Sequence, residues 1–106
     1  MVSRITMTTE LVLEALLKDP EAEHYGSQLG ADAALPSGTV HPILARLERA
    51  GWVGSRWEDI DPAATGRPRR RYYRLTPDGR REATAALFRA HNRRTRLSSR
   101  SVAEPT

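Results

Sequence analysis

The sequence predicts a mainly helical fold that also contains one small β-hairpin. Apolar residues recur at helical spacing in several segments of the chain, most clearly in residues 40–47. Residues 52–57 and 71–75 instead alternate with the two-residue period of a strand. A stretch rich in proline and glycine separates these two strands. The 106 residues are enough for one domain, which we place at residues 1–97.

The first helix is expected from Thr9 to Lys18, with Thr8 or Thr9 as its cap. Its apolar side chains lie almost all round the helix, at Leu11, Val12, Leu13, Ala15, Leu16 and Leu17. A helix of this kind is buried on more than one side. We therefore expect one side to pack on its own domain and another side to pack on a second subunit.

Two further helices are predicted after a polar connection at residues 21–24. The second is a short helix at about Gly26–Ala34. The third has one apolar stripe, formed at i, i+3, i+4 and i+7 by Val40, Ile43, Leu44 and Leu47. Gly51 stands at the position of a left-handed cap at its end.

The start of the third helix is complicated by Pro42, which has no N–H group to donate. If Ser37 capped the helix, this proline would be the fifth helical residue and would remove a hydrogen bond. We expect either Gly38 or Thr39 to cap the helix instead, which places Pro42 within the first turn, or a distorted first turn.

The second half of the chain reads as a hairpin followed by a long helix. The alternation of Val53, Ser55 and Trp57 predicts the first strand, and residues 71–75 predict the second. Residues 61–68 are expected as a loop between them. Thr76 and Pro77 form a strong helix start, and the helix is expected to end near Leu97. Residues 98–106 are expected to be a disordered tail.

This order of elements predicts a winged helix-turn-helix, in which an α-helix enters the major groove of DNA and a hairpin flanks it. The side chains near the start of the third helix are free to reach base edges, and we expect DNA contacts from Ser37, Gly38, Thr39, His41, Pro42 and Arg46. The hairpin tip, or wing, offers arginines that can follow a phosphate backbone, at Arg67, Arg69, Arg70 and Arg71.

The charge is distributed unevenly along the chain, as expected for a protein that binds nucleic acid. Residues 1–50 carry four basic and seven acidic side chains, whereas residues 51–106 carry thirteen basic and six acidic ones. The formal net charge of +4 therefore arises from the second half. Such asymmetry attracts phosphate over long distances.

Several function classes are disfavoured by what the sequence lacks. There is no cysteine, no glycine-rich phosphate loop and no nucleophile motif, and the three histidines are scattered. We therefore expect neither an enzyme, nor a metal site, nor a cofactor. No segment approaches the 20 apolar residues of a membrane span, so we expect a cytoplasmic protein that contacts no membrane.

Two long motifs resemble the PadR family of transcription regulators: residues 37–53, SGTVHPILARLERAGWV, and residues 66–79, GRPRRRYYRLTPDG. Tyr25-Gly26 resembles the start of the family's second helix. His41 departs from the family's usual tyrosine, which leaves DNA contact plausible because both side chains stack and donate hydrogen bonds.

The resemblance implies a homodimer on double-stranded DNA, formed by the first and last helices. We expect its interface at Leu11, Leu13, Leu17, Leu87, Ala90 and Leu97. It also implies a roughly palindromic operator, repression, and release by a small-molecule effector. Two alternatives stay open: a winged-helix module that binds proteins, and a nonspecific binder of nucleic acid.

Overall fold

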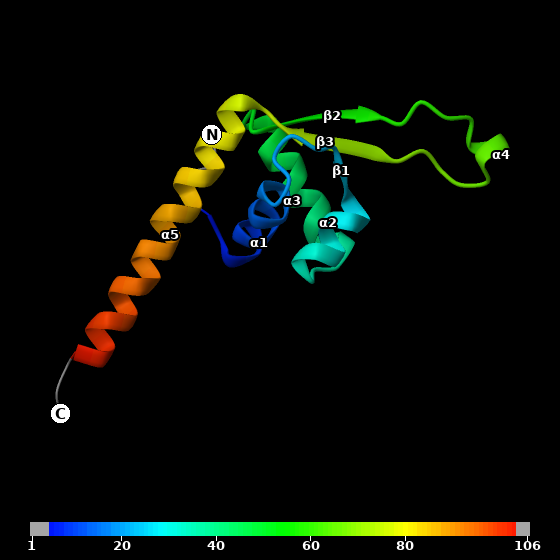
Figure 1. Ribbon diagram of the computed structural model, residues 1–106. Coiled ribbons are helices and arrows are strands. Elements are labelled where there is room, and N and C mark those ends of the chain that lie inside the picture. Colours follow the sequence, from blue (N-terminus) through cyan, green and yellow to red (C-terminus); the bar gives the residue numbers. More distant parts are fainter. Residues whose placement is uncertain (1–4, 104–106) are drawn as a thin grey trace.

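The computed structural model describes the backbone of residues 5–103 and the side chains of residues 5–98. Its elements, in chain order, are α1 (Met7–Leu17), β1 (His24–Tyr25), α2 (Gly26–Ala33), α3 (Ser37–Arg49), β2 (Val53–Trp57), α4 (Pro62–Thr65), β3 (Arg71–Leu75) and α5 (Pro77–Ala103). The predicted class is confirmed: three helices cluster together, a β-hairpin projects from them, and a long helix extends away on the other side (Figure 1).

The sheet has three antiparallel strands in the order β1-β3-β2, one strand more than predicted. The extra strand is β1, which we expected to belong to a polar connection. His24 and Tyr25 lie opposite Tyr73 and Tyr72 of β3. A two-residue strand has no periodicity of its own, and only its pairing with β3 makes it a strand.

His24 shows why the connection before α2 is not a surface loop. The residue is 3% exposed. Its Nε2 lies 3.0 Å from the carbonyl oxygen of Asp19, and its Nδ1 accepts from the amide of Gln28 at 3.1 Å. Both ring nitrogens thus have partners, which is the usual condition for burying a polar side chain.

The core lies between the three short helices, the base of the sheet and the start of α5. The predicted stripe of α3 is confirmed, since Val40, Ile43, Leu44 and Leu47 are all buried. Trp52 is also buried. Trp57 is 59% exposed, because the outer end of β2 extends past the core (Figure 1).

Two predicted helix starts are wrong. The first helix begins at Met7, capped by Thr6, whose hydroxyl accepts from the Thr9 N–H at 3.3 Å. The third helix begins at Ser37, so neither Gly38 nor Thr39 caps it, and Pro42 is its sixth residue. The carbonyl of Pro36 accepts from the next turn's N–H groups and sets this earlier start. In a regular helix, the N–H group of residue 42 would donate a hydrogen bond to the carbonyl of Gly38, and Pro42 has no such group. Gly38 is exposed, so water can reach this residue.

The segment between the two long strands is not all loop. Residues 61–68 contain the single-turn helix α4, whose first turn is capped by Asp61 through the Ala63 N–H at 3.1 Å. Gly66 ends this turn with a φ of 79°. Asp61 and Pro62 are ordinary start signals for a helix, but in the sequence they read only as breakers.

The last helix extends beyond its predicted end near Leu97, because α5 runs to Ala103. Residues 98–103, which were expected in a disordered tail, continue α5, and residues 104–106 lie outside the described residues. No glycine or proline occurs between Gly79 and Pro105, so no residue in this stretch interrupts a helix. Among the described residues, no helix has both the length and the apolar content needed to cross a membrane.

An ion pair joins the two helices that lie furthest apart in the sequence. Glu10 of α1 is only 4% exposed, and its Oε2 accepts from Nη1 of Arg94 on α5 at 2.7 Å. A buried carboxylate requires such a partner. The pair fixes the position of α5 on α1 one turn beyond Ala90, the last buried residue of α5 among the described side chains.

Candidate nucleic-acid interface

The exposed side of α3 carries the predicted recognition residues. Five of the six are exposed, namely Ser37, Gly38, His41, Pro42 and Arg46, and Thr39 is half-buried. The apolar stripe of the same helix faces the core, so these residues are free to contact a ligand. This arrangement suits the entry of a helix into the major groove.

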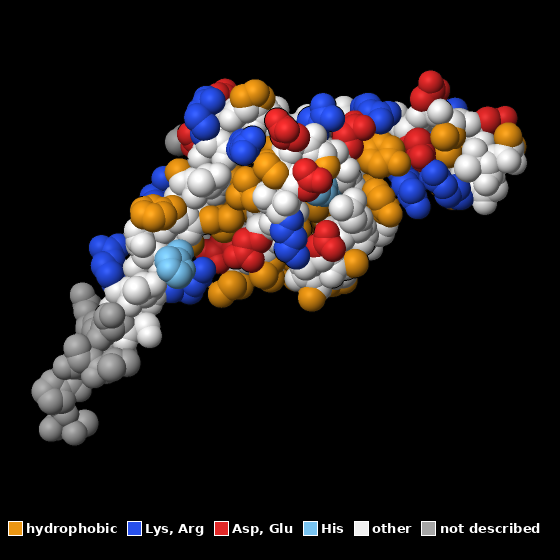
Figure 2. All heavy atoms as spheres, in the orientation of Figure 1, with side chains coloured by type: hydrophobic (Ala, Val, Ile, Leu, Met, Phe, Trp, Pro, Cys, Tyr) orange, Lys and Arg blue, Asp and Glu red, His pale blue; other side chains and the backbone are white. Residues whose placement is uncertain are grey.

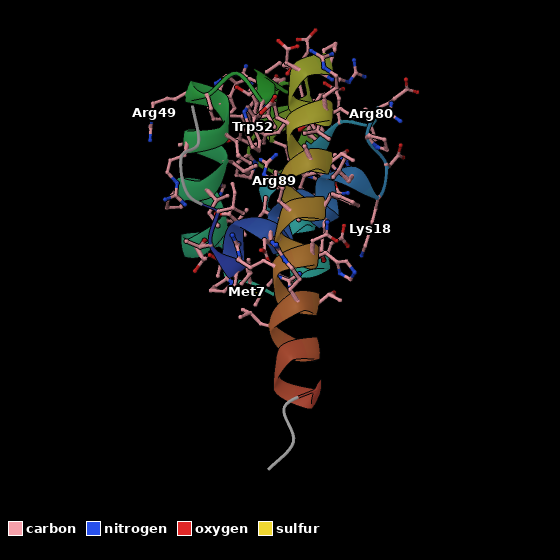
Figure 3. All side chains as sticks on the ribbon, turned by 90° about the vertical axis from the view of Figure 1, so that its left-hand side faces the viewer. Met7, Lys18, Arg49, Trp52, Arg80 and Arg89 are labelled. Carbon is pink, nitrogen blue, oxygen red and sulfur yellow. The ribbon has the colours of Figure 1, made fainter. Side chains whose placement is uncertain are left out.

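Arg49 belongs to the same exposed side and was missed in the sequence. It lines a hollow of about 450 Å³ together with Thr39, Pro42 and Arg46. Figure 3 shows Arg49 extending outward from the end of α3. The signal was present, because Arg49 follows Arg46 by three residues and Pro42 by seven, which are helical spacings.

His41 has a defined neighbour at the start of α2. An ideal Cβ atom placed on Gly26 would lie 2.7 Å from Cε1 and 3.2 Å from Nε2 of His41. The imidazole thus lies against the backbone of Gly26, and the two helices meet at this point. Glycine at residue 26 leaves the space that the imidazole occupies.

The wing is organised around one carboxylate, that of Glu58. Arg67 donates to both of its oxygens, at 2.7 and 2.8 Å. The backbone N–H of Arg70 and the hydroxyl of Tyr72 donate to it as well, each at 3.2 Å. The hydrogen bond from Arg67 is the main reason that the pKa of Glu58 falls to about 2. The charge of Arg67 is therefore paired with a carboxylate within the wing, which the sequence did not indicate.

Arg70 and Arg56 lie over aromatic rings on the outer face of the sheet. The guanidinium carbon of Arg70 is 4.3 Å from the ring centre of Tyr25, and that of Arg56 is 5.1 Å from the ring of Tyr72. Arg56 also pairs with Glu23 at 2.6 Å. Guanidinium groups stacked in this way keep their positive charge and can still donate hydrogen bonds.

Arg71 connects the base of the wing to the recognition helix. Its guanidinium donates twice to the hydroxyl of Ser55, at 2.9 and 3.1 Å, and lies 3.5 Å from Oε1 of Glu48 on α3. It also lies 5.3 Å from the ring centre of Trp57. These contacts fix the angle between wing and helix, so Arg71 positions the wing as well as contributing charge.

Arg69 is the most available of the four predicted wing arginines. It is exposed, and its only hydrogen bond to a described residue is from Nε to the carbonyl of Ile60 at 2.9 Å. It borders a hollow of about 580 Å³ with Trp57, Pro62 and Pro68. Figure 2 shows basic side chains along both edges of the projecting wing, with acidic ones between them.

Two of the six predicted dimer residues are buried within the chain itself. Leu13 and Ala90 are 0% and 2% exposed and lie in the chain's own core, so they offer no area to a second subunit. Leu97 is 57% exposed, and the remaining three are half-buried: Leu11, Leu17 and Leu87. Two exposed apolar residues were missed, Met7 on α1 and Phe88 on α5.

Solved structures with the same fold are numerous. A protein of Streptococcus mutans UA159 is 20% identical, with a TM-score of 0.73, over 100% of this chain and 98% of that one. A PadR family transcriptional regulator from Eggerthella lenta DSM 2243 is 25% identical, with a TM-score of 0.70, over 89% of this chain and 83% of that one. BpsR of Bordetella bronchiseptica, whose DNA binding is regulated by 6-hydroxynicotinic acid, is 19% identical, with a TM-score of 0.69, over 93% and 68%.

A search of curated proteins finds no significant match. The model of the PadR-like family of transcriptional regulators matches residues 21–85, which is more than half of the chain and includes α2, α3 and the whole wing. The family is one of DNA-binding regulators rather than enzymes. On this match, and on the recognition helix and wing described above, the chain belongs to the PadR-like family of transcriptional regulators.

Proposed function

We propose that the chain binds a roughly palindromic operator as a homodimer, represses transcription from the cytoplasm, and is released by a small-molecule effector. The observation that carries this proposal is the pairing of an exposed, polar side of α3 with a wing whose base is fixed to α3 by Arg71 and Glu48. A fixed angle between helix and wing lets one subunit contact a major groove and the neighbouring backbone together.

The dimer is supported by apolar surface that remains open on α1 and α5. Leu97 follows Ala83, Ala86 and Ala90 at helical spacing, and those three alanines are buried against the chain's own core. At Leu97 the same stripe has passed beyond the core and is exposed. Met7 and Phe88 add exposed apolar area on the same two helices. A second copy of the chain would cover such surface.

Two recognition helices related by a two-fold axis would contact half-sites about one helical turn apart, ~34 Å. This spacing is what makes a palindromic operator the natural target. The effector is proposed from likeness alone: the DNA binding of BpsR, which has the same fold, is regulated by 6-hydroxynicotinic acid.

The test starts with selection of bound duplexes from a random-sequence pool, followed by titration of the selected duplex and of a scrambled control. We expect a preference of about 10³-fold or more for the selected duplex, with two subunits bound to each. Equal affinity for both duplexes would instead indicate a nonspecific binder. Absence of binding at low salt would favour a module that binds proteins.

A further inference from the structure

A hollow of about 650 Å³ lies on the side of the chain away from the recognition helix, between the connection that follows α1 and the start of α5. Its walls come from residues 20–21, 74–77 and 80–81. Figure 3 shows this connection running beside the first turns of α5, with Arg80 and Lys18 extending on the same side. Its volume is typical of a site for a small molecule.

The hollow has an excess of positive charge. Three arginines line it, and one of them, Arg81, pairs with Asp78. Among the described residues, no side-chain hydrogen bond or ion pair involves the guanidinium groups of Arg74 and Arg80. The pKa of nearby Glu23 is lowered mainly by its hydrogen bond with Arg56, with which its carboxylate is paired, and the charge of Arg74 contributes to this lowering. Glu21 is the one acidic residue of the wall. Two guanidinium groups that are free to donate are suited to an anion with two negative charges.

The rest of the wall is largely apolar and comes from Pro20, Leu75 and Pro77. Such a wall favours a ligand that also has a small apolar body. The hollow does not include the apolar residues Leu11 or Leu97, so its ligand would not compete directly with a second subunit there.

The floor of the hollow is bonded to the end of the recognition helix. The hydroxyl of Thr76 donates to the carbonyl of Gly51 at 2.7 Å, and its N–H donates to the carbonyl of Trp52 at 3.0 Å. Gly51 follows α3 after a single residue, Ala50. Arg74 belongs to β3 and lies opposite Gly54 in the wing. A ligand held here would therefore contact residues that are joined to both DNA-reading elements.

We propose that this hollow binds a small dianion with an apolar body, held by Arg74 and Arg80, and that its occupation changes the affinity of the chain for DNA. The second part rests on the proposed function. A phosphate monoester and a dicarboxylate share the chemistry that the two guanidinium groups require, so both are probed.

The binding experiment uses the full chain without DNA. Butyl phosphate and glutarate are titrated by calorimetry at about pH 8, where both are dianions, and sodium chloride is used to match the ionic strength. We expect at least one of them to bind, and Arg74→Gln and Arg80→Gln each to raise its Kd by about tenfold or more. The matched control is Arg89→Gln, which removes the same charge from an exposed position elsewhere on α5 and should leave the Kd unchanged.

Binding of butyl phosphate alone would assign a phosphate monoester, and binding of glutarate alone a dicarboxylate; both results support the proposal. Binding of neither probe overturns it, as does a Kd that the control variant raises as much as Arg80→Gln. A second titration measures the Kd for the selected duplex with and without the bound probe. An unchanged Kd for DNA would overturn the coupling. Failure of DNA binding with intact dianion binding would instead refute the proposed function alone.

Discussion

His41 lies so close to the backbone of Gly26 that a Cβ atom on residue 26 would stand 2.7 Å from its Cε1 atom. The contact joins the start of α2 to the exposed side of α3. The obstructing atom belongs to a side chain that can rotate away, so a methyl group at residue 26 would displace the imidazole without breaking the fold.

Gly26→Ala should therefore change DNA recognition more than stability. We expect its free energy of unfolding to stay within about 1 kcal/mol of the wild-type value, since only one exposed side chain must move. We expect its preference for the selected duplex to fall as it does in His41→Ala. Urea unfolding and duplex titration measure the two quantities. Equal loss on selected and scrambled duplexes would contradict a base-reading role for His41.

Gly79→Ala should be strongly destabilising. A Cβ atom at residue 79 would overlap the backbone carbonyl of Trp52, which cannot rotate away because Thr76 and the sheet hold it. We expect a loss of about 3 kcal/mol in the free energy of unfolding. Gly54→Ala is the control, since nothing lies within 4 Å of its Cβ position, and it should change stability by less than about 1 kcal/mol.

Glu58 should make the stability of the chain depend on acid pH. Its pKa is lowered from 4.5 to about 2 in the folded chain, mainly by the hydrogen bond from Arg67. Because the folded pKa is the lower one, this stabilisation is fully present above about pH 4.5 and is lost as the pH falls toward 2. Glu58→Gln should lack this part of the pH dependence, as measured by chemical unfolding between these values.

The control for this pH series is Glu14→Gln, at an exposed position of α1. It should follow the wild-type curve. A Glu58→Gln variant whose stability fell with acid as steeply as that of the wild type would show that the wing carboxylate does not contribute to acid sensitivity.

The wing arginines should differ in their contribution to the salt dependence of DNA binding. Arg69 is free to reach a phosphate, so Arg69→Gln should reduce the slope of log K against log salt by about 0.9 for each phosphate that the side chain neutralises. Arg93→Gln, on α5, should leave this slope unchanged. Duplex titrations over a salt series measure both. An unchanged slope in Arg69→Gln would contradict the assignment of Arg69 to a phosphate.

The dimer should depend on Leu97. Leu97→Glu places a charge on the exposed end of the apolar stripe of α5 and should shift the chain from dimer to monomer, because burying an unpaired carboxylate is unfavourable. Thr95→Glu is the control, since Thr95 is exposed and lies off that stripe. Sedimentation velocity distinguishes the two states. A Leu97→Glu variant that remained dimeric would place the interface elsewhere.

Elements with a strong period of their own could be predicted from the sequence, and elements that depend on partners could not. The stripe from Val40 to Leu47 and the alternation from Val53 to Trp57 produced the helix and strand they indicated. Strand β1 has two residues and owes its conformation to β3. The start of α3 was misplaced because Pro42 favoured a later start capped by Gly38 or Thr39, whereas the carbonyl of Pro36 accepts the first N–H groups.

The candidate interface shows the same division. The composition and the order of the elements indicated which segment carries the arginines, but not which carboxylate each arginine pairs with. Arg67 pairs with Glu58, nine residues away, and Arg71 with Glu48, 23 residues away. The first pair depends on the register between β2 and β3, and the second also depends on how α3 packs against the sheet; the sequence specifies neither. Leu13 was likewise assigned to the dimer interface, although it is buried in the chain's own core. The period of apolar residues on a helix does not show whether a buried side packs on its own domain or on a second subunit.

The pairing of Glu10 with Arg94 joins residues 84 positions apart, so it affects the order in which the fold can form. A contact of such long sequence separation requires a large loop to close first, which slows folding. While the chain is being synthesised, the carboxylate of Glu10 has to stay hydrated until residue 94 has emerged. The three short helices can pack together earlier, but the side of α1 that contacts α5 stays exposed until α5 has been synthesised. A chain interrupted before Ala83 would keep the sequence of its recognition helix and wing and yet leave the face of the core that α5 covers open to water.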